Sequence, residues 1–174
     1  MSAVHVLPYS TQWPEAFTAV RTTLLEIFGN DAVAVEHIGS TAVPGLAAKP
    51  VIDVLLGAPS LAVIEQRITA LAARGFDYVS KHERVLPQRR YFVMQPPGGL
   101  RVHVHGVVTG GHLWREHLTF RDALRGDAQL RARYQALKLQ LAAEHADDKA
   151  AYTEAKGPFI LGALAALGTA ECLP

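Results

Sequence analysis

The sequence has little of what marks secreted, membrane-spanning and disulfide-stabilised proteins. Its single cysteine, Cys172, excludes an internal disulfide framework and favours a reducing compartment. No basic segment followed by an apolar run opens the chain, so we expect no signal peptide. No stretch approaches the roughly 20 apolar residues that a spanning helix needs, and the apolar run 160–167 is short and meets Gly168. We therefore predict a soluble, cytoplasmic protein with no membrane partner.

The chain also lacks excess charge and the common phosphate-binding and catalytic motifs. Its formal net charge is +1, so bulk electrostatics does not indicate nucleic acid as a partner. The aromatic residues, 7% of the chain, do not alternate with basic residues as a nucleic-acid platform requires. The motifs GxxxxGK(S/T), GxGxxG, HExxH and GxSxG are absent. A site, if present, must come from local clustering of side chains.

What is present is the composition of a globular domain. Hydrophobic residues make up 49% and charged residues 19% of the 174 residues, which excludes a disordered chain. The length suits one domain with a real core. Because neither repeats nor a low-complexity linker interrupt the sequence, we predict a single domain over residues 1–174.

The front half alternates between helical and strand patterns. Apolar residues at helical spacing predict a first helix that ends at Gly29, and Ser60 is expected to cap a second helix that ends at Gly75. Pro96 to Gly99 predicts a tight turn between two strands. The residues that carry the first helix are Trp13, Phe17, Val20, Leu24 and Phe28. The segments expected as strands are 33–38, 51–56, 76–79, 89–94 and 100–108.

After Gly111 the apolar period is helical to the end of the chain. Asp127 is expected to cap one helix and Asp147 another, which runs towards Leu167 with an interruption at Gly157–Pro158. A mixed front half followed by a helical back half predicts an α+β fold, in which helices cover one side of a small mixed sheet.

The segment His37 to Leu56 carries the strongest functional signal. A predicted strand runs into Gly39-Ser40, and the next strand is a continuous apolar run broken by Asp53. Glycine lets backbone approach a ligand closely, while Ser40 and Thr41 offer hydroxyl and N–H groups to phosphate oxygens. A carboxylate inside an apolar strand must be paired, protonated or bound to a cation. An ordinary turn beside a structural ion pair is the competing interpretation.

This segment resembles the signature of the GrpB family, bacterial proteins of the nucleotidyltransferase fold. The resemblance extends over nearly the whole chain, and further blocks that carry it are His103–His105, Phe120–Arg125, Tyr134–Lys138, Leu141 and Tyr152–Lys156. It implies a compact mixed sheet with flanking helices, a helical C-terminal half, and a nucleotide or other phosphorylated small molecule as ligand. In some members of the family the domain is fused behind dephospho-coenzyme A kinase.

The strand of Asp53 departs from the nucleotidyltransferase pattern at one position. Those enzymes place two carboxylates two residues apart on the strand after Gly-Ser, whereas this chain has Asp53 followed by Leu55. A two-metal phosphoryl-transfer site needs several oxygen ligands around two ions. One carboxylate from this strand does not suffice, so we do not expect the ordinary two-metal site.

Two histidines are the candidates that complete the site. His103 and His105 lie two residues apart in a predicted strand and therefore face the same side of the sheet. With Asp53 they form a candidate catalytic and metal-binding set. The nucleotidyltransferase-like fold favours Mg or Mn as the metal, whereas imidazole ligands favour Mn, Fe or Zn. The alternative interpretations are polar contact with a ligand without metal, or two ordinary strand histidines.

Basic residues supply the remaining part of a phosphate site. Those within the family-like blocks are the candidates for ligand binding, together with Gly39, Ser40 and Thr41. For each of them a solvated surface charge is the alternative. These basic candidates are Lys49, Arg90, Lys138 and Lys156.

Three functions remain open at this point. The first is binding of a nucleotide or other phosphorylated small molecule, with metal-dependent nucleotidyl or phosphoryl transfer if the protein is an enzyme. The second is a non-catalytic accessory domain, which Leu55 favours. The third is a small metallohydrolase that uses Asp53, His103 and His105.

Overall fold

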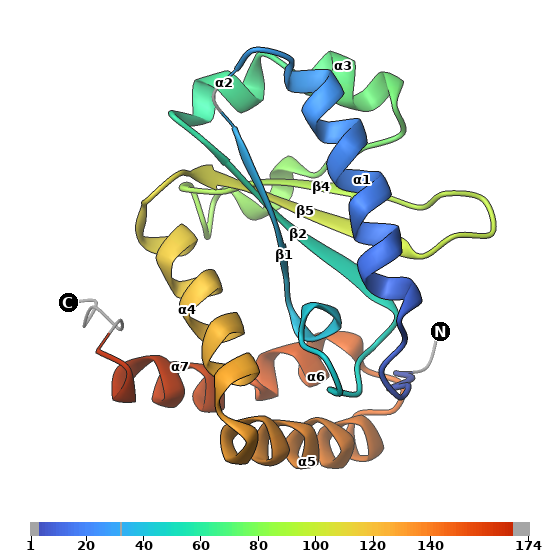
Figure 1. The fold of residues 1–174 in the computed structure, drawn as a ribbon, viewed down its shortest axis with the longest axis vertical. Helices are drawn as coiled ribbons and strands as arrows, with labels where there is room; N and C mark the ends of the chain where they lie inside the picture. The colour runs from blue at the N-terminus through green and yellow to red at the C-terminus, as the bar shows by residue number, and fades with distance from the viewer. Residues whose placement is uncertain (1–3, 32, 169–174) are drawn as a thin grey trace.

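The protein is built on a five-stranded mixed sheet with the strand order β1-β2-β5-β4-β3 (Figure 1). The computed structural model describes residues 4–31 and 33–168, so Cys172 lies outside the described residues. β2 and β5 run parallel in the centre of the sheet, and every other neighbouring pair is antiparallel. The strands are β1 (Ala34–Ile38), β2 (Val51–Ala58), β3 (Asp77–Tyr78), β4 (Arg90–Met94) and β5 (Arg101–Val108).

One face of the sheet is covered by α1 (Gln12–Phe28), α2 (Leu61–Glu65) and α3 (Ile68–Ala73). The alternate residues of β2 that point to this face are apolar and buried, and they form the main core with the apolar side of α1. The largest members contributed by these two elements are Leu24, Phe28, Ile52, Val54 and Leu56. Burial of each such side chain contributes about 1.5–3 kcal/mol, so this layer fixes the sheet.

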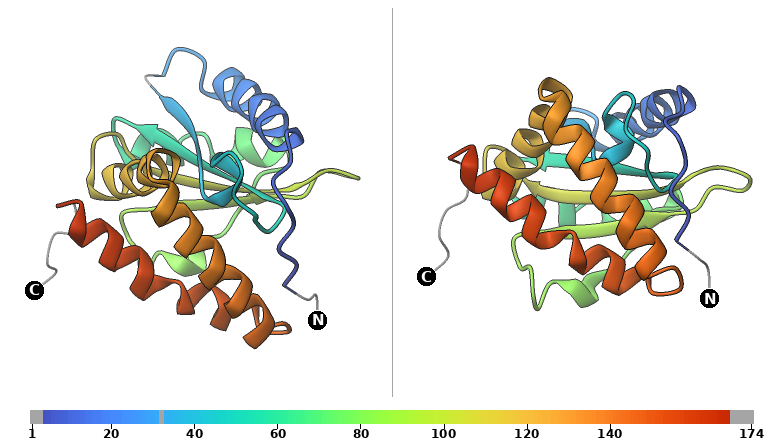
Figure 2. Two further views of the ribbon diagram at one scale, coloured as in Figure 1. Left: turned by 60° about the horizontal axis from the view of Figure 1, so that its bottom comes forward. Right: turned by 90° about the horizontal axis from the view of Figure 1, so that it is seen from below.

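The other face is covered by the C-terminal helices, which Figure 2 shows on the opposite side of the sheet from α1. α4 (His112–Gly126) contacts β1, β2 and β5, and its Trp114 packs beside buried Leu55. The other helices of this layer are α5 (Ala128–Glu144), α6 (Lys149–Ala155) and α7 (Gly157–Ala166). They bury Tyr134 against Val43 and Leu46 of the loop between β1 and β2. The helical half thus holds the loop that carries Gly39-Ser40.

The structure confirms the α+β fold, but helices cover both faces of the sheet, so the prediction of a one-sided sheet was wrong. The reason is that β2 is apolar on both faces: Val54 and Leu56 point to α1, and Leu55 points to α4. No helix in the described part of the chain is long and apolar enough to cross a membrane.

Most helix boundaries follow the predicted caps. The carboxylate of Asp127 accepts hydrogen bonds from two backbone N–H groups at the start of α5, at 2.8 and 2.9 Å. The cap of α6 is Asp148 and not Asp147, and Ser60 makes no side-chain cap bond. The helix predicted from residue 61 is divided into α2 and α3. As predicted, the final helical run is interrupted at Gly157–Pro158, where α7 begins.

Candidate functional site

A cleft of about 430 Å³ lies between the α4–α7 side of the sheet and helices α5 and α6. It gathers nine of the ten residues singled out from the sequence, contributed by the loop after β1, by β2 and β5, and by α5 and α6. They are Gly39, Ser40, Thr41, Lys49, Asp53, His103, His105, Lys138 and Lys156. The fold therefore brings together residues that are up to 117 positions apart in the chain, from Gly39 to Lys156.

The Gly39-Ser40 turn forms the floor of this cleft beside Asp53. Gly39 has φ 71° and ψ −174°, a conformation essentially restricted to glycine, and Ser40 opens a short 3₁₀ helix, η1 (Ser40–Ala42). A Cβ atom at residue 39 would lie 2.7 Å from Oδ2 of Asp53. The glycine therefore serves two purposes: it permits the turn, and it leaves room for the carboxylate. Thr41 also lines the cleft, but its hydroxyl donates to the Val51 carbonyl at 3.0 Å.

Gly39→Ala is expected to lower the free energy of unfolding by about 2–4 kcal/mol, because backbone strain and a clash with Asp53 add together. Gly45→Ala is the matched control. Gly45 has φ 78°, and a Cβ atom there would have no neighbour within 4 Å, so only the strain of about 1–2 kcal/mol applies. Urea denaturation of both variants measures the difference. Equal losses would mean that the carboxylate does not need the space beside residue 39.

Asp53 is held by two histidines of the neighbouring parallel strand. Asp53 lies directly opposite His103 in the β2–β5 register. Its Oδ1 atom is 3.4 Å from Nδ1 of His103 and 3.5 Å from Nε2 of His105. Burial acts to raise the pKa of the Asp53 carboxyl, but hydrogen bonds and charges from the two histidines outweigh burial and hold the pKa well below its usual value. Asp53 is therefore ionised at neutral pH.

More aromatic and imidazole rings surround this group than the sequence indicated. Tyr91 of β4 contacts both histidines, with ring centroids 5.6 Å from His103 and 5.3 Å from His105. His117 of α4 lies 5.6 Å from His105, and burial lowers its pKa to about 4, so it is uncharged at pH 7. Arg89 stacks over Tyr91 at 5.0 Å. Strand alternation could have placed Tyr91 on this face, but no pattern in the sequence pointed to His117.

The Asp53 group does not fit the expected metal centre. In residues 4–31 and 33–168, no set of three or more His, Cys, Asp or Glu side chains is arranged to hold a metal ion. Both imidazole rings lie next to the same carboxylate oxygen, Oδ1, and the other oxygen, Oδ2, packs beside Gly39. The donors are therefore directed at one another and not at a common point. A catalytic role for Asp53, His103 and His105 stays a prediction.

Three lysines also line the cleft. Lys138 is only 1% exposed, and its ammonium donates to Oγ of Ser40 at 2.9 Å and to the Ala47 carbonyl. Lys49 and Lys156 both contact the ring of Tyr152, with Nζ atoms 4.5 and 4.6 Å from its centroid. Across the described residues, none of the three lysines forms an ion pair with a carboxylate.

The pKa values of these three lysines lie below the usual value for lysine. Burial lowers the pKa of Lys138 to about 7, with a further contribution from the charge of Lys156. Burial, together with the charge of Lys49, lowers the pKa of Lys156 to about 8. The pKa of Lys49 is also lowered, chiefly by burial. An anion entering the cleft would stabilise all three ammonium groups.

Arg90 is the one predicted ligand-binding residue that does not reach the cleft. It pairs with Glu65 at 2.6 Å and with Glu83 at 3.5 Å. The reason is strand alternation: Tyr91 points into the cleft, so its neighbour Arg90 points to the α2 side of the sheet. Arg89, one residue earlier, lines the cleft and contacts Nδ1 of His105 at 3.3 Å.

Leu55, at the position where nucleotidyltransferases have the second carboxylate, is buried and closed off from the cleft. Leu55 faces the same side of the sheet as Asp53 and is 0% exposed. It lies in an apolar cluster with Ile38 and Val107, onto which three residues of α4 pack. These are Leu113, Trp114 and Leu118. A metal ion could not reach this position without displacing α4.

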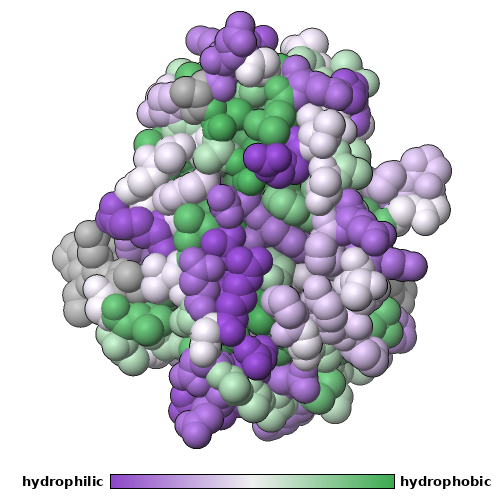
Figure 3. Space-filling model, viewed as in Figure 1, coloured by the Kyte–Doolittle hydropathy of each residue, from purple (hydrophilic) through white to green (hydrophobic). Residues whose placement is uncertain are grey.

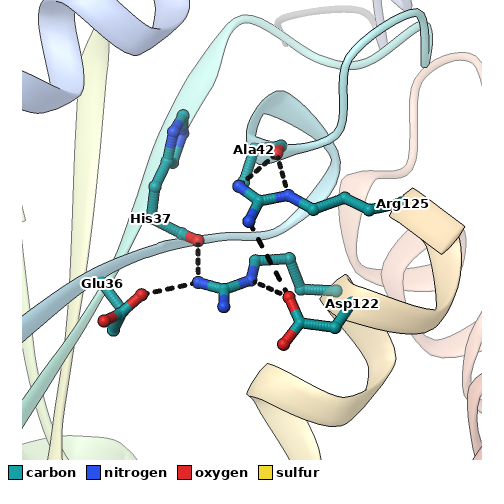
Figure 4. Close-up of polar contacts among 6 residues, drawn as sticks. Glu36, His37, Ala42, Asp122 and Arg125 are labelled. Carbon is teal, nitrogen blue, oxygen red and sulfur yellow. Dashed lines mark hydrogen bonds and ion pairs between the residues drawn. The ribbon is translucent and has the colours of Figure 1, made fainter.

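The basic residues of α4 hold the site in place from outside. Arg121 donates to Glu36 at 2.7 Å and to the His37 carbonyl at 3.1 Å, and Arg125 donates twice to the Ala42 carbonyl (Figure 4). On the face drawn in Figure 3, hydrophilic residues gather in a band through the middle of the molecule. These bonds fix α4 to β1 and to η1, so both arginines position the Gly39-Ser40 turn.

Comparison with known proteins agrees with this arrangement. The chain is 37% identical over 158 residues to the UPF0157 protein YqkA of Bacillus subtilis, covering 90% of this chain and 45% of that protein. It is 38% identical over 163 residues to the UPF0157 protein SCO7215 of Streptomyces coelicolor, covering 94% and 83%. A dephospho-CoA kinase of Mycolicibacterium paratuberculosis is 30% identical over 179 residues, covering 90% and 44%. The chain thus spans under half the length of two of these relatives.

Solved structures agree on the fold. The crystal structure of GrpB from Enterococcus faecalis superposes with a TM-score of 0.79 at 34% identity, covering 90% of this chain and 92% of that one. Cid1 poly(U) polymerase superposes with a TM-score of 0.57 at 12% identity, covering 86% and 49%, which shows a shared nucleotidyltransferase-like fold. The sequence profile of the family described as GrpB protein matches residues 3–166. The chain therefore belongs to the GrpB family.

Proposed function

We propose that the cleft binds a nucleotide or another phosphorylated small molecule, whose phosphate groups lie between the Gly39-Ser40 turn and the three lysines. The observation that carries the proposal is that Lys49, Lys138 and Lys156 converge on one cleft without a carboxylate partner in the described structure. A buried lysine without an anion is unfavourable, because burial removes water from the charge. Asp53 is the carboxylate that acts on Lys49 and Lys156 from a distance, and a phosphate group adds both further negative charge and acceptors for the ammonium groups.

The Gly39-Ser40 turn supports the same ligand. Its glycine lets the backbone approach a phosphate closely, and Oγ of Ser40 is already oriented by Lys138 at 2.9 Å. Asp53 and its two histidines line the same cleft as the lysines, and the charge of Asp53 acts to raise the pKa of Lys49 and of Lys156. These three residues would contact the part of the ligand next to the phosphates. The names of related proteins suggest the first ligands to try: the Cid1 structures include one with MgGTP, and one relative is a dephospho-CoA kinase.

Binding without two-metal chemistry is the function we favour over nucleotidyl transfer. Leu55 occupies the place of the second carboxylate and is sealed beneath α4. The Asp53 group does not fit a metal centre, so we derive no step through Mg, Mn or Zn. If the protein is an enzyme, Asp53, His103 and His105 are the groups we expect to exchange protons with the ligand, since an imidazole beside a carboxylate suits general acid–base catalysis.

Binding of inorganic tripolyphosphate, followed by calorimetry, tests the proposal and predicts a pH dependence. The pKa values of about 7 for Lys138 and about 8 for Lys156 lie below that of a free lysine, and a bound anion raises them. At a pH above these pKa values, the lysines of the free protein are largely neutral and must take up protons when the anion binds. The affinity therefore falls by up to about tenfold per pH unit for each lysine. We expect the Kd to rise at least about tenfold between pH 7 and 9.

Titration of the ligand itself cannot account for a rise in Kd between pH 7 and 9, because tripolyphosphate only becomes more anionic as the pH rises. Titrations in buffers of different ionisation enthalpy should show net proton uptake near pH 8. A Kd above 1 mM at pH 6.5, or an affinity that increases from pH 7 to 9, would overturn the proposed function.

A further inference from the structure

A second cavity, of about 320 Å³, adjoins the phosphate cleft. The two share a wall formed by the Gly39-Ser40 turn, Asp53 and Lys156. The second cavity lies on the α4 and α7 side of this wall, whereas the first lies on the α5 and α6 side. A ligand with phosphates in the first cavity can therefore extend past Ser40 into the second.

The lining of the second cavity differs in character from that of the first. Its walls include five aliphatic and aromatic side chains from β1, α4 and α7. These are Ile38, Phe120, Leu124, Ile160 and Leu164.

Of the three lysines of the first cavity, only Lys156 also lines the second, at the shared wall, and the carboxylate of Glu116 in the second cavity pairs with His112 at 3.1 Å. Arg121 lines the second cavity, but its guanidinium already pairs with Glu36 at 2.7 Å and with Asp122 at 2.8 Å. His117 lines it as well and is uncharged at pH 7, because burial lowers its pKa to about 4. This chemistry suits an uncharged group that is largely apolar and has a few hydrogen-bonding atoms at its edge.

We propose that the second cavity binds the uncharged organic group of the ligand whose phosphates occupy the lysine-lined cleft. The inference rests on the proposed function and makes it narrower: the ligand is a phosphate ester of a ring-bearing or branched organic group, not inorganic phosphate or polyphosphate. The two cavities divide the ligand by charge, and the Ser40–Asp53 wall marks the junction between its two parts.

Ligand pairs that differ only in the organic group test this inference in the wild-type protein. ATP and UTP are compared with tripolyphosphate, and phenyl phosphate with inorganic phosphate, all by calorimetry at pH 7. We expect at least one ester to bind about tenfold or more tightly than its inorganic counterpart, since a buried organic group adds apolar contact. The inference is wrong if no ester binds more tightly than its counterpart.

A variant that fills the second cavity provides the independent test. Ile160→Trp places a large ring in the cavity, and Leu161→Trp, at a neighbouring residue that is 60% exposed, is the matched control. We expect Ile160→Trp to remove the advantage of the ester while changing the Kd of tripolyphosphate less than twofold. Leu161→Trp should change neither value.

The outcomes separate this inference from the proposed function. If tripolyphosphate does not bind the wild type, the phosphate cleft itself is wrong. If tripolyphosphate binds but Ile160→Trp leaves the ester advantage intact, only the second cavity is wrong. Circular dichroism and the retained affinity for tripolyphosphate report whether Ile160→Trp is folded, and Ile160→Phe is the smaller replacement if it is not.

Discussion

Lys138→Met is expected to weaken tripolyphosphate binding at pH 6.5 by at least about a hundredfold while leaving the protein as stable as the wild type, or more stable. Lys138 is 1% exposed; its ammonium donates to two neutral acceptors, Ser40 Oγ and the Ala47 carbonyl, and lies 5.0 Å from the centroid of the Tyr134 ring. An ammonium group in such a place costs free energy that only an anion returns. Loss of a charged hydrogen-bond donor to phosphate costs about 1.5–3 kcal/mol per bond, and we expect more than one such bond.

The effect on stability has a definite pH dependence. The folded-state pKa of Lys138, about 7, lies below the unfolded value near 10.5, so the unfolded chain binds more protons between these two values. The penalty is therefore complete below pH 7 and disappears as the pH approaches 10.5. Lys138→Met removes the penalty but also two hydrogen bonds, for a net gain of about 1–3 kcal/mol at pH 6 that fades by pH 10.

Urea denaturation at pH 6, 8 and 10 measures the stability, and calorimetry measures the binding. Lys81→Met is the control, because Lys81 is an exposed lysine outside the cleft and its loss changes the net charge equally. A Lys138→Met variant that is less stable than the wild type at pH 6 would show that the ammonium is a structural group. Unchanged binding would remove Lys138 from the phosphate site.

The sequence was sufficient to predict the residues of the cleft that lie on or beside the two central strands. Asp53 was recognisable because it interrupts a buried apolar run, and His103 and His105 because their spacing puts them on one face of a strand. The structure adds what spacing could not supply, namely that Asp53 lies opposite His103 in the register. Arg90 was the error, and the same alternation rule would have rejected it once Tyr91 was placed in the cleft.

The remaining wall of the cleft could not be predicted from local pattern. Lys138 and Lys156 lie on helices whose approach to Ser40 depends on tertiary packing, and only the resemblance to a family pointed to them. His117 gave no signal, because a single histidine on a helix is indistinguishable from a surface residue. Similarly, the presence of Leu55 was plain, but its burial under α4 was not.

Both the Asp53 group and the three lysines thus distinguish this site from that of a metal-dependent nucleotidyltransferase. Such an enzyme gathers carboxylates, so that metal ions can bind and neutralise the phosphates. Here the single carboxylate is taken up by two histidines, and three lysines without carboxylate partners in the described structure provide positive charge directly. In the function that we propose, these lysines take the place of bound metal ions beside the phosphates of the ligand.

Leu55→Asp is therefore expected to unfold the protein and not to restore a two-metal site. The substitution removes an apolar side chain that is 0% exposed, a change that alone costs about 2–5 kcal/mol, and places a carboxylate in the apolar space between β2 and α4. The total loss should exceed about 4 kcal/mol, out of the roughly 5–15 kcal/mol that stabilises a typical domain.

Thermal denaturation should place the Tm of Leu55→Asp at least about 10 °C below that of the wild type, or show no cooperative transition at all. Leu55→Met, which conserves volume and polarity, should cost less than about 1.5 kcal/mol and keep tripolyphosphate binding. A Leu55→Asp protein that kept the wild-type Tm and bound Mn²⁺ would mean that residue 55 opens to the cleft. A two-metal site for nucleotidyl transfer could then form in this fold. We expect the opposite, because Ile38, Val107 and Trp114 surround residue 55 and leave a carboxylate there without water.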